Sequence, residues 1–147
     1  LPNDRAINLY PSLCFFEGTN VSIGRGTDKQ FQVYGSPFIA DVDINYCFTP
    51  QPNKGAKYPK HQGIECCGFD LSDGEQLNQI NLGYLIETYS STLKKEDFFN
   101  HFYTKLAGTK KLQQQIEDGL TETEIKATWQ KGLKRFKKIR EKYLIYN

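Results

Sequence analysis

The spacing of apolar residues changes from a strand-like to a helical period near Gly74, and this change constrains the fold more than any other feature. Across Asp41–Thr49, apolar and polar residues alternate, which is typical of a half-buried strand. After Gly74, apolar residues recur every three or four positions, which indicates amphipathic helices. Since the two patterns occupy different halves of the chain, the sequence predicts an α+β fold.

Further strands are expected in the N-terminal half. Residues 9–16, LYPSLCFF, form a short apolar run that ends at a glycine-rich loop. Residues 31–39 are a second candidate, interrupted by Gly35 and Pro37, and residues 64–71 are a third. With the alternating segment, these runs predict a mixed β-sheet that the C-terminal helices cover.

The second half predicts four helices. The first follows Gly74, the second spans residues 95–106 and ends at Gly108, and the third spans 110–118 and ends at Gly119. The fourth begins at Thr121, since Glu124 completes a capping box. Its apolar stripe contains Ile125, Trp129, Leu133, Phe136, Ile139 and Tyr143. We expect Trp129 to lie in the core.

Gly132 lies inside the predicted fourth helix. A glycine there costs about 1 kcal/mol relative to alanine. We therefore expect another backbone to approach the helix closely at this position.

The chain has 147 residues, which suits a single domain, and its formal net charge is only +2. Eight Lys or Arg and one acid, Glu141, lie between Lys126 and Lys142. This pattern favours a solvated helix face. Nucleic-acid binding is disfavoured, because the aromatic residues lie on the opposite stripe.

No apolar segment approaches the roughly 20 residues of a membrane span. The start at Leu1 and the absence of methionine predict a piece of a longer product.

The four cysteines do not match a metal site. Cys14, Cys47, Cys66 and Cys67 form no CxxC pair, so zinc is disfavoured, and no metal or cofactor is expected. Cys14 and Cys47 lie in apolar runs and are expected to be buried. If the protein is exported, the sequence also allows a disulfide among the four.

Polar chemistry is concentrated in residues 16–27, FEGTNVSIGRGT. Glycines allow a backbone to approach a ligand closely, and the polar side chains between them add donors and acceptors. Such a loop suits a polyhydroxylated or anionic ligand. The alternative is a structural turn that its own side chains stabilise. The candidate ligand-binding residues are Glu17, Asn20, Ser22, Arg25, Gly26 and Thr27.

Three separated blocks resemble a known family. They are LYPSLCFFEGTNVSIGRGTDKQFQVYGSPFI, KHQGIECCGFDL and the tail KLAGTKKLQQQIEDGLTETEIKATWQKGLKRFKKIREKYLIY. In order and spacing they resemble the C-terminal domain of the exo-β-N-acetylmuramidase family, the YbbC-like or NamZ-type proteins. The resemblance implies an exported bacterial glycoside hydrolase, periplasmic or extracellular, that acts in cell-wall degradation and muropeptide recycling. Such an enzyme removes N-acetylmuramic acid from the non-reducing end of peptidoglycan fragments.

In that family, an N-terminal Rossmann-like domain precedes a domain similar to this chain, and the active site lies between them. The resemblance therefore implies that residues 1–147 form one wall of the cleft and are inactive alone. The partners would be muramic acid saccharides and the N-terminal domain of the same protein.

Glu17 is the candidate catalytic residue. Glycosidic hydrolysis ordinarily uses two carboxyl groups about 5 to 9 Å apart, although an acetamido oxygen of the substrate can replace the nucleophile. Glu17 comes where the predicted strand meets the loop, so it could point into a cleft. The alternative is that its carboxylate accepts hydrogen bonds from the loop and stabilises the turn.

Arg25 is a candidate specificity residue. Muramic acid carries a lactyl carboxylate that glucosamine lacks, and a guanidinium matches a carboxylate with two hydrogen bonds. The alternative is an ion pair of Arg25 with Asp28 or Asp41.

His61 and Asp70 are further candidates for substrate binding. His61 precedes a predicted strand and could donate a proton or bind an anion, and Asp70 lies at the end of that strand. A different function would be a non-catalytic module that binds cell-wall glycan or assembles with a partner domain.

Overall fold

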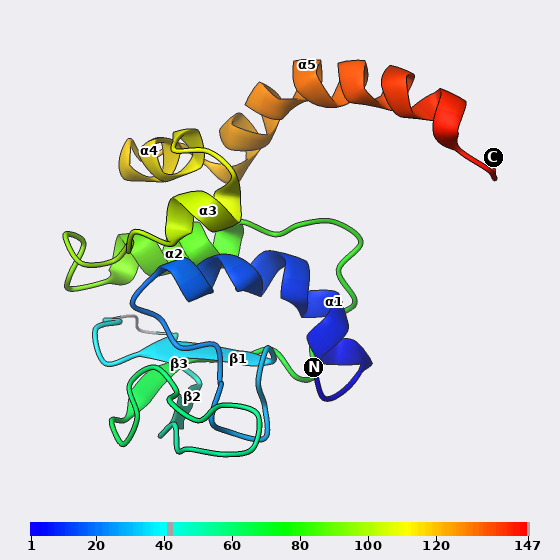
Figure 1. The fold of residues 1–147 in the computed structure, drawn as a ribbon. Helices are drawn as coiled ribbons and strands as arrows, with labels where there is room; N and C mark the ends of the chain where they lie inside the picture. The colour runs from blue at the N-terminus through cyan, green and yellow to red at the C-terminus, as the bar shows by residue number, and fades with distance from the viewer. Residues whose placement is uncertain (41–42, 147) are drawn as a thin grey trace.

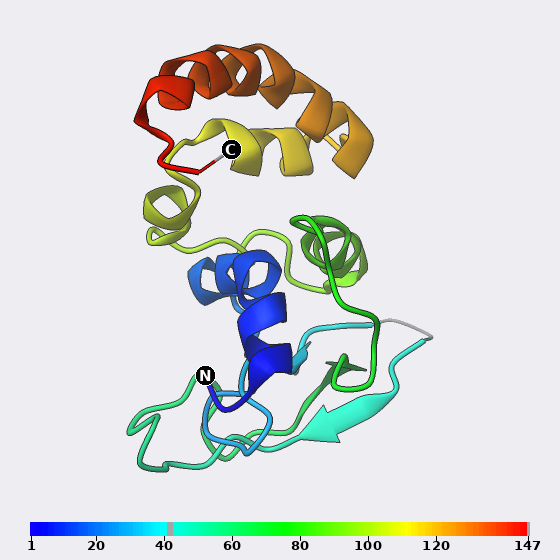
Figure 2. The ribbon, with the colours of Figure 1, turned by 90° about the vertical axis from the view of Figure 1, so that its right-hand side faces the viewer.

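A computed structural model of the chain describes residues 1–40 and 43–146, and shows a small sheet covered by successive layers of helix (Figure 1). Helices α1 and α2 lie on the sheet, α3 and α4 follow, and α5 is outermost (Figures 1 and 2). The predicted α+β class is confirmed. The first covering helix, however, comes from the N-terminal half.

Helix α1, Asp4–Leu13, occupies most of the segment predicted as a strand at residues 9–16. The side chain of Asn3 caps it by accepting a hydrogen bond from the Ala6 amide. Buried Ala6, Leu9 and Leu13 recur at helical spacing. The run then tightens into the 3₁₀ helix η1, Cys14–Gly18. The strand prediction was therefore wrong.

The sheet has three strands in the order β1-β3-β2. Strand β1 is Val33–Ser36, β2 is Tyr46–Phe48 and β3 is Cys66–Asp70. Both pairings between these described strands are antiparallel, whereas a mixed sheet was predicted. The predicted strand at 41–49 shortens to β2, and its first two residues lie outside the described part of the chain.

A disulfide joins Cys47 on β2 to Cys67 on β3, where the two residues are register partners. Cys47 is exposed, so the prediction that it is a buried small hydrophobe was wrong. Cys14 is half-buried and free, and Cys66 is buried and free.

The helices of the second half are shorter than predicted, except the last. Helix α2 is Gly83–Ser91, α3 is Tyr103–Ala107, α4 is Lys111–Glu117 and α5 is Glu122–Arg140, followed by the 3₁₀ helix η2, Glu141–Tyr143. The capping box of Thr121 and Glu124 is confirmed. The stops at Gly108 and Gly119 are confirmed by their positive φ angles. The long aromatic helix predicted at 95–106 was wrong, because only its end is helical.

The main core lies between α1, α2, η1 and the inner face of β1. Phe16 stacks on Tyr34 with ring centroids 4.9 Å apart, and Phe98 and Tyr103 are fully buried above them. Each such side chain contributes about 1.5–3 kcal/mol through burial. This core places η1, and therefore Glu17, on a rigid support.

In the part of the chain that the structure describes, no helix has the length and apolar character needed to cross a membrane.

Candidate functional site

The end of η1 packs tightly against α3, and the loop that follows it pairs with β1. At Gly18, a Cβ would lie 2.5 Å from the Cα of Tyr103, so a larger residue does not fit. Ser22 then pairs with Gly35 of β1 through two backbone hydrogen bonds of 2.8 and 2.9 Å. The side chain of Thr19 donates to the Phe16 carbonyl and accepts from the Val21 amide. The loop conformation is therefore fixed by its neighbours.

Lys60 holds the same loop from outside. Its ammonium group donates to the carbonyl oxygens of Phe16, Thr19 and Val21, at 3.1, 2.5 and 2.8 Å. Burial lowers the pKa of Lys60 to about 8, although the nearby Glu17 carboxylate acts in the opposite direction. Lys60 thus connects three backbone positions of the segment that carries Glu17.

His61 extends this contact by one residue. Its Nε2 lies 2.6 Å from the Asn20 carbonyl oxygen, and the Phe38 ring meets the imidazole edge-on. The backbone of His61 has a φ of 57°, which is uncommon for a residue other than glycine. The predicted cleft residue His61 therefore contacts the loop backbone. We call Lys60 and His61 together the loop clamp.

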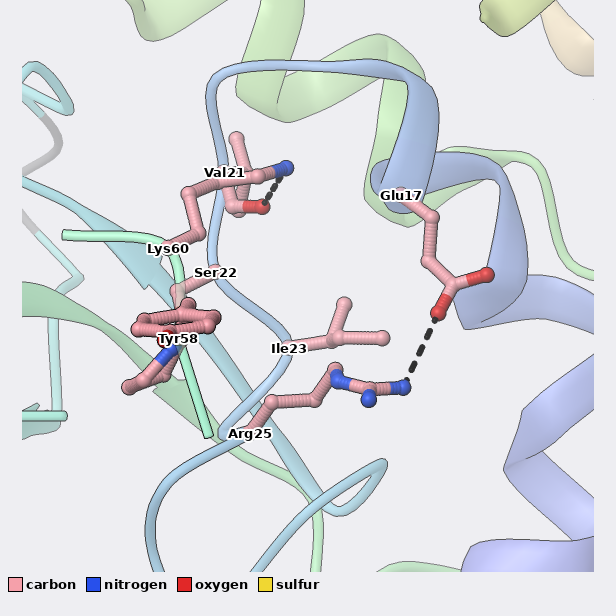
Figure 3. Close-up of a pocket in the computed structure, with 8 residues that line it drawn as sticks. Glu17, Val21, Ser22, Ile23, Arg25, Tyr58 and Lys60 are labelled. Carbon is pink, nitrogen blue, oxygen red and sulfur yellow. Dashed lines mark hydrogen bonds and ion pairs between the residues drawn. The ribbon is translucent and has the colours of Figure 1, made fainter. Parts of the chain in front are cut away.

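A pocket of about 200 Å³ opens beside the clamped loop. Figure 3 shows Glu17 and Arg25 pointing toward each other on one side, with Tyr58 and Lys60 on the other. Tyr58 is 81% exposed and forms part of the rim. The lining residues are Glu17, Val21, Ser22, Ile23, Arg25, Tyr58, Pro59 and Lys60.

Glu17 and Arg25 form an ion pair on one side of the pocket, with Nη1 and Oε1 3.6 Å apart. Arg25 also donates a long hydrogen bond of 3.4 Å to the Gly55 carbonyl. Half of the Arg25 side chain remains exposed. The expected alternative partners were Asp28 and Asp41. Within the described residues the ion pair of Arg25 is with Glu17, and Asp41 lies outside that part of the chain.

Two predicted ligand-binding side chains have buried polar atoms that form no hydrogen bond with any residue that the structure describes. They are the Oγ of Ser22, which lines the pocket, and both amide atoms of Asn20. Native proteins pair most of their buried polar groups. The Ser22 hydroxyl is therefore a buried polar group at the pocket wall whose hydrogen-bonding capacity no other described residue uses.

The other predicted site residues lie elsewhere. Gly26 lines a neighbouring pocket of about 150 Å³ that shares Arg25. Thr27 closes a turn, donating to the Gly24 carbonyl and accepting from the Lys29 amide. Both residues belong to the loop but are absent from the lining of the first pocket.

Asp70 is held by a structural ion pair. Its carboxylate contacts the Lys29 ammonium at 2.5 Å and accepts from the amide and hydroxyl of Ser72. Burial alone would raise the pKa of Asp70, but these hydrogen bonds hold that pKa below its usual value. The structure does not bring Asp70 to the pocket of Glu17, and its predicted contact with substrate stays a prediction.

Sequence reasoning missed Lys60 and Tyr58 as parts of the site. Lys60 binds carbonyl oxygens, which every residue carries, so its partners leave no signature in the sequence. Tyr58 lies in a polar loop rich in proline and glycine, which signalled only a connection.

Cys47, Glu65 and Cys67 lie close enough together to resemble a metal site. The two sulfur atoms are joined in the disulfide, so neither thiolate is available as a ligand.

Comparisons with known proteins agree with the resemblance seen in the sequence. The family model described as exo-β-N-acetylmuramidase NamZ, C-terminal, matches residues 8–146. The peptidoglycan β-N-acetylmuramidase NamZ of Bacillus subtilis is 31% identical over 160 aligned positions, covering 99% of this chain and 39% of the relative. A crystal structure of a DUF1343 family protein from Bacteroides fragilis has a TM-score of 0.89 and 44% identity, covering 99% of this chain and 42% of that one. The chain spans about two fifths of the length of these relatives.

Proposed function

The chain belongs to the family of C-terminal regions of exo-β-N-acetylmuramidase NamZ, and from this premise we propose that it forms one wall of a glycoside hydrolase site. The proposed enzyme removes N-acetylmuramic acid from the non-reducing end of peptidoglycan fragments, in cell-wall degradation and muropeptide recycling. The observation that carries the proposal is the pocket in which Glu17, Arg25 and Ser22 meet.

Glu17 is proposed to supply a catalytic carboxyl group. It is the acidic residue among those that line the described pocket, and η1 holds it against the core. Because glycosidic hydrolysis needs a second group, that group must come from further polypeptide or from the acetamido oxygen of the substrate. A pocket with one carboxylate on a rigid wall suits half of an active site.

Arg25 is proposed to bind the lactyl carboxylate of muramic acid. Its ion pair with Glu17 is 3.6 Å long and half of its side chain is exposed, so guanidinium N–H groups remain accessible. A planar guanidinium can give a carboxylate two parallel hydrogen bonds. Ser22 and Asn20 would then hydrogen-bond the sugar hydroxyls or the acetamide.

A non-catalytic glycan-binding or domain-assembly module is the second candidate. The exposed Tyr58 ring at the pocket rim favours it, because aromatic faces provide large, rigid contact surfaces. This alternative predicts that sugars bind to the pocket without turnover.

The proposed location is the periplasm or the cell exterior. The disulfide between Cys47 and Cys67 supports it, because disulfides persist chiefly in oxidising compartments.

The enzyme proposal is tested with para-nitrophenyl N-acetylmuramide and the longest polypeptide that the gene of this chain encodes. We expect release of the chromogen, and a loss of at least about a hundredfold in Glu17→Gln. Glu65→Gln is the matched control, because it removes the same charge from an exposed position outside the pocket. Undiminished turnover in Glu17→Gln would remove Glu17 from catalysis. Sugar binding without any turnover would favour the glycan-binding module.

The role of Arg25 is tested by titrating the 147-residue chain with N-acetylmuramic acid and N-acetylglucosamine, observed by NMR. Arg25→Ala should abolish the preference for the muramic sugar while leaving the weaker binding of glucosamine. An unchanged preference would contradict the proposed contact with the lactyl carboxylate.

A further inference from the structure

The second half of α5 and the following η2 present an apolar stripe that is largely exposed within the described chain. Leu133, Phe136, Ile139 and Tyr143 are between 45% and 71% exposed. Every described residue from 130 to 146 is exposed, and the helix extends past the other helices toward the C-terminus (Figure 1). We call these four side chains the outer stripe. The sequence predicted them on one face of a packed helix, but within the described residues that packing ends near Trp129.

The outer stripe is too regular to be a set of scattered surface residues. Its members follow Ile125 and Trp129 at helical spacing, and Ile125 is fully buried while Trp129 is half-buried. The stripe therefore continues the face that already packs on the body. Contiguous exposed apolar surface of this kind marks an interaction site.

Gly132 lies within the same face, and apart from its own helix backbone no atom of the described residues lies within 4 Å of the place where a Cβ would be. The predicted close approach of another backbone therefore does not occur among the described residues. A glycine that costs about 1 kcal/mol in a helix suits a face where a polypeptide packs closely. A lipid surface would gain nothing from it.

The charges around the outer stripe select the kind of partner. Eight Lys or Arg lie between Lys126 and Lys142, with Glu141 as the sole acid. Two copies packed through this face would bring two positive rims together, which is unfavourable. The surface fits a polypeptide with an apolar centre and an acidic rim.

The relatives show where such a polypeptide could come from. The Bacteroides fragilis protein matches 99% of this chain with a TM-score of 0.89, yet this chain covers only 42% of its length. The match therefore includes α5, and the larger part of that protein has no counterpart in residues 1–147. We propose that the outer stripe and Gly132 form the surface on which the remaining polypeptide of a NamZ-type protein docks, separately from the glycan pocket.

Amide hydrogen exchange tests this surface. It is measured on the 147-residue chain and on the longest polypeptide that its gene encodes. In the short chain, the amides of residues 130–140 should exchange rapidly. In the longer polypeptide, they should exchange at least about tenfold more slowly.

Two variants that change the charge equally sharpen the test. In the longer polypeptide, Phe136→Asp on the stripe should restore rapid exchange at residues 130–140. Lys134→Gln, on the opposite side of the helix, should not. Binding of N-acetylmuramic acid to the 147-residue chain should be the same in Phe136→Asp and the unaltered chain, so that failure of the docking surface and failure of the pocket are distinguishable.

Several outcomes would overturn the proposal. Equal exchange in the short and long polypeptides would do so, as would a gene that encodes no further chain. Protection of the short chain that rises with its own concentration, together with a dimer mass, would assign the surface to a second copy. Protection by vesicles of phosphatidylglycerol would assign it to anionic lipid.

Discussion

The loop of residues 16–27 and the second half of α5 are held by different kinds of interaction. The loop has little regular structure, but Lys60, His61, Thr19 and the edge of β1 fix its backbone through hydrogen bonds. The helix satisfies its own backbone, but its side chains beyond residue 130 contact almost nothing in the described chain. Regular secondary structure and tertiary constraint are therefore separate properties, and the candidate site lies in a segment that tertiary hydrogen bonds hold in place.

Two phenylalanine truncations should show the contrast most strongly. Phe16, the first residue of the loop, is fully buried, so Phe16→Ala should lower the free energy of unfolding by about 3–5 kcal/mol. Phe136 is exposed on α5, so Phe136→Ala should change it by less than about 0.5 kcal/mol. Urea unfolding of the 147-residue chain, followed by circular dichroism, measures both. Similar decreases of the free energy of unfolding in the two variants would contradict the difference between the loop and α5.

Removing the disulfide should weaken the sheet beside the loop and leave α5 unchanged. The bond closes a separation of 20 residues, so replacing Cys47 and Cys67 together by serine should cost about 3 kcal/mol. Hydrogen exchange should accelerate in β2 and β3 while the amides of α5 keep their rates. Faster exchange confined to α5 would contradict this separation.

Lys60 should make the stability of the loop region depend on pH in a distinctive direction. Its pKa falls from 10.5 in the unfolded chain to about 8 in the folded one, so the unfolded state binds more protons between these values. The cost of burying the cation is present below about pH 8 and is relieved as the pH rises toward 10.5. As the pH rises through this range, the free energy of unfolding of the unaltered chain should increase by up to about 3 kcal/mol relative to that of Lys60→Met.

Urea unfolding at intervals from pH 7 to 10.5 measures this difference, with Lys134→Met on exposed α5 as the control. The control should follow the pH dependence of the unaltered chain. A fall in the free energy of unfolding of the unaltered chain relative to Lys60→Met as the pH rises would contradict this, because it would mean that the carbonyl acceptors raise the pKa of Lys60 above its ordinary value.

Two glycine-to-alanine changes should have moderate effects of opposite sign. Gly26 has a φ of 87°, and a Cβ there would lie 2.6 Å from the Gln51 carbonyl oxygen. Gly26→Ala should therefore lower the free energy of unfolding by more than about 1 kcal/mol. Gly132 is open, so Gly132→Ala should stabilise the 147-residue chain by up to about 1 kcal/mol. Thermal unfolding distinguishes the signs. If the outer stripe docks as proposed, the gain at Gly132 should disappear in the longer polypeptide.

The strand predicted at residues 9–16 was wrong because apolar residues were weighed without the capping residues that precede them. The run at residues 9–16 indicates a strand when its apolar residues are considered alone. Pro11 adds to this error, because proline is disfavoured inside a helix. Asn3 and Asp4 carried the missing signal, because together they form an N-cap and an acidic first turn. The capping box of α5 was recognised correctly because its residues interact within a single turn.

The candidate site was predictable in part for the same reason. Glu17, Ser22 and Arg25 share one loop, so the sequence could nominate them together, and the structure places all three around one pocket. Lys60 and Tyr58 come from a distant segment, and only folding brings them to that loop. The roles in binding and catalysis stay predictions.

The sequence by itself determined the α+β class, the start of α5, the stops at Gly108 and Gly119 and the loop where polar chemistry gathers, because these depend on neighbouring residues along the chain. Only the tertiary structure decided that α1 covers the sheet, that Glu17 faces Arg25, and that the Lys60 ammonium binds carbonyl oxygens of the loop. Those outcomes depend on contacts between distant segments, and backbone carbonyl groups are alike at every position of the chain.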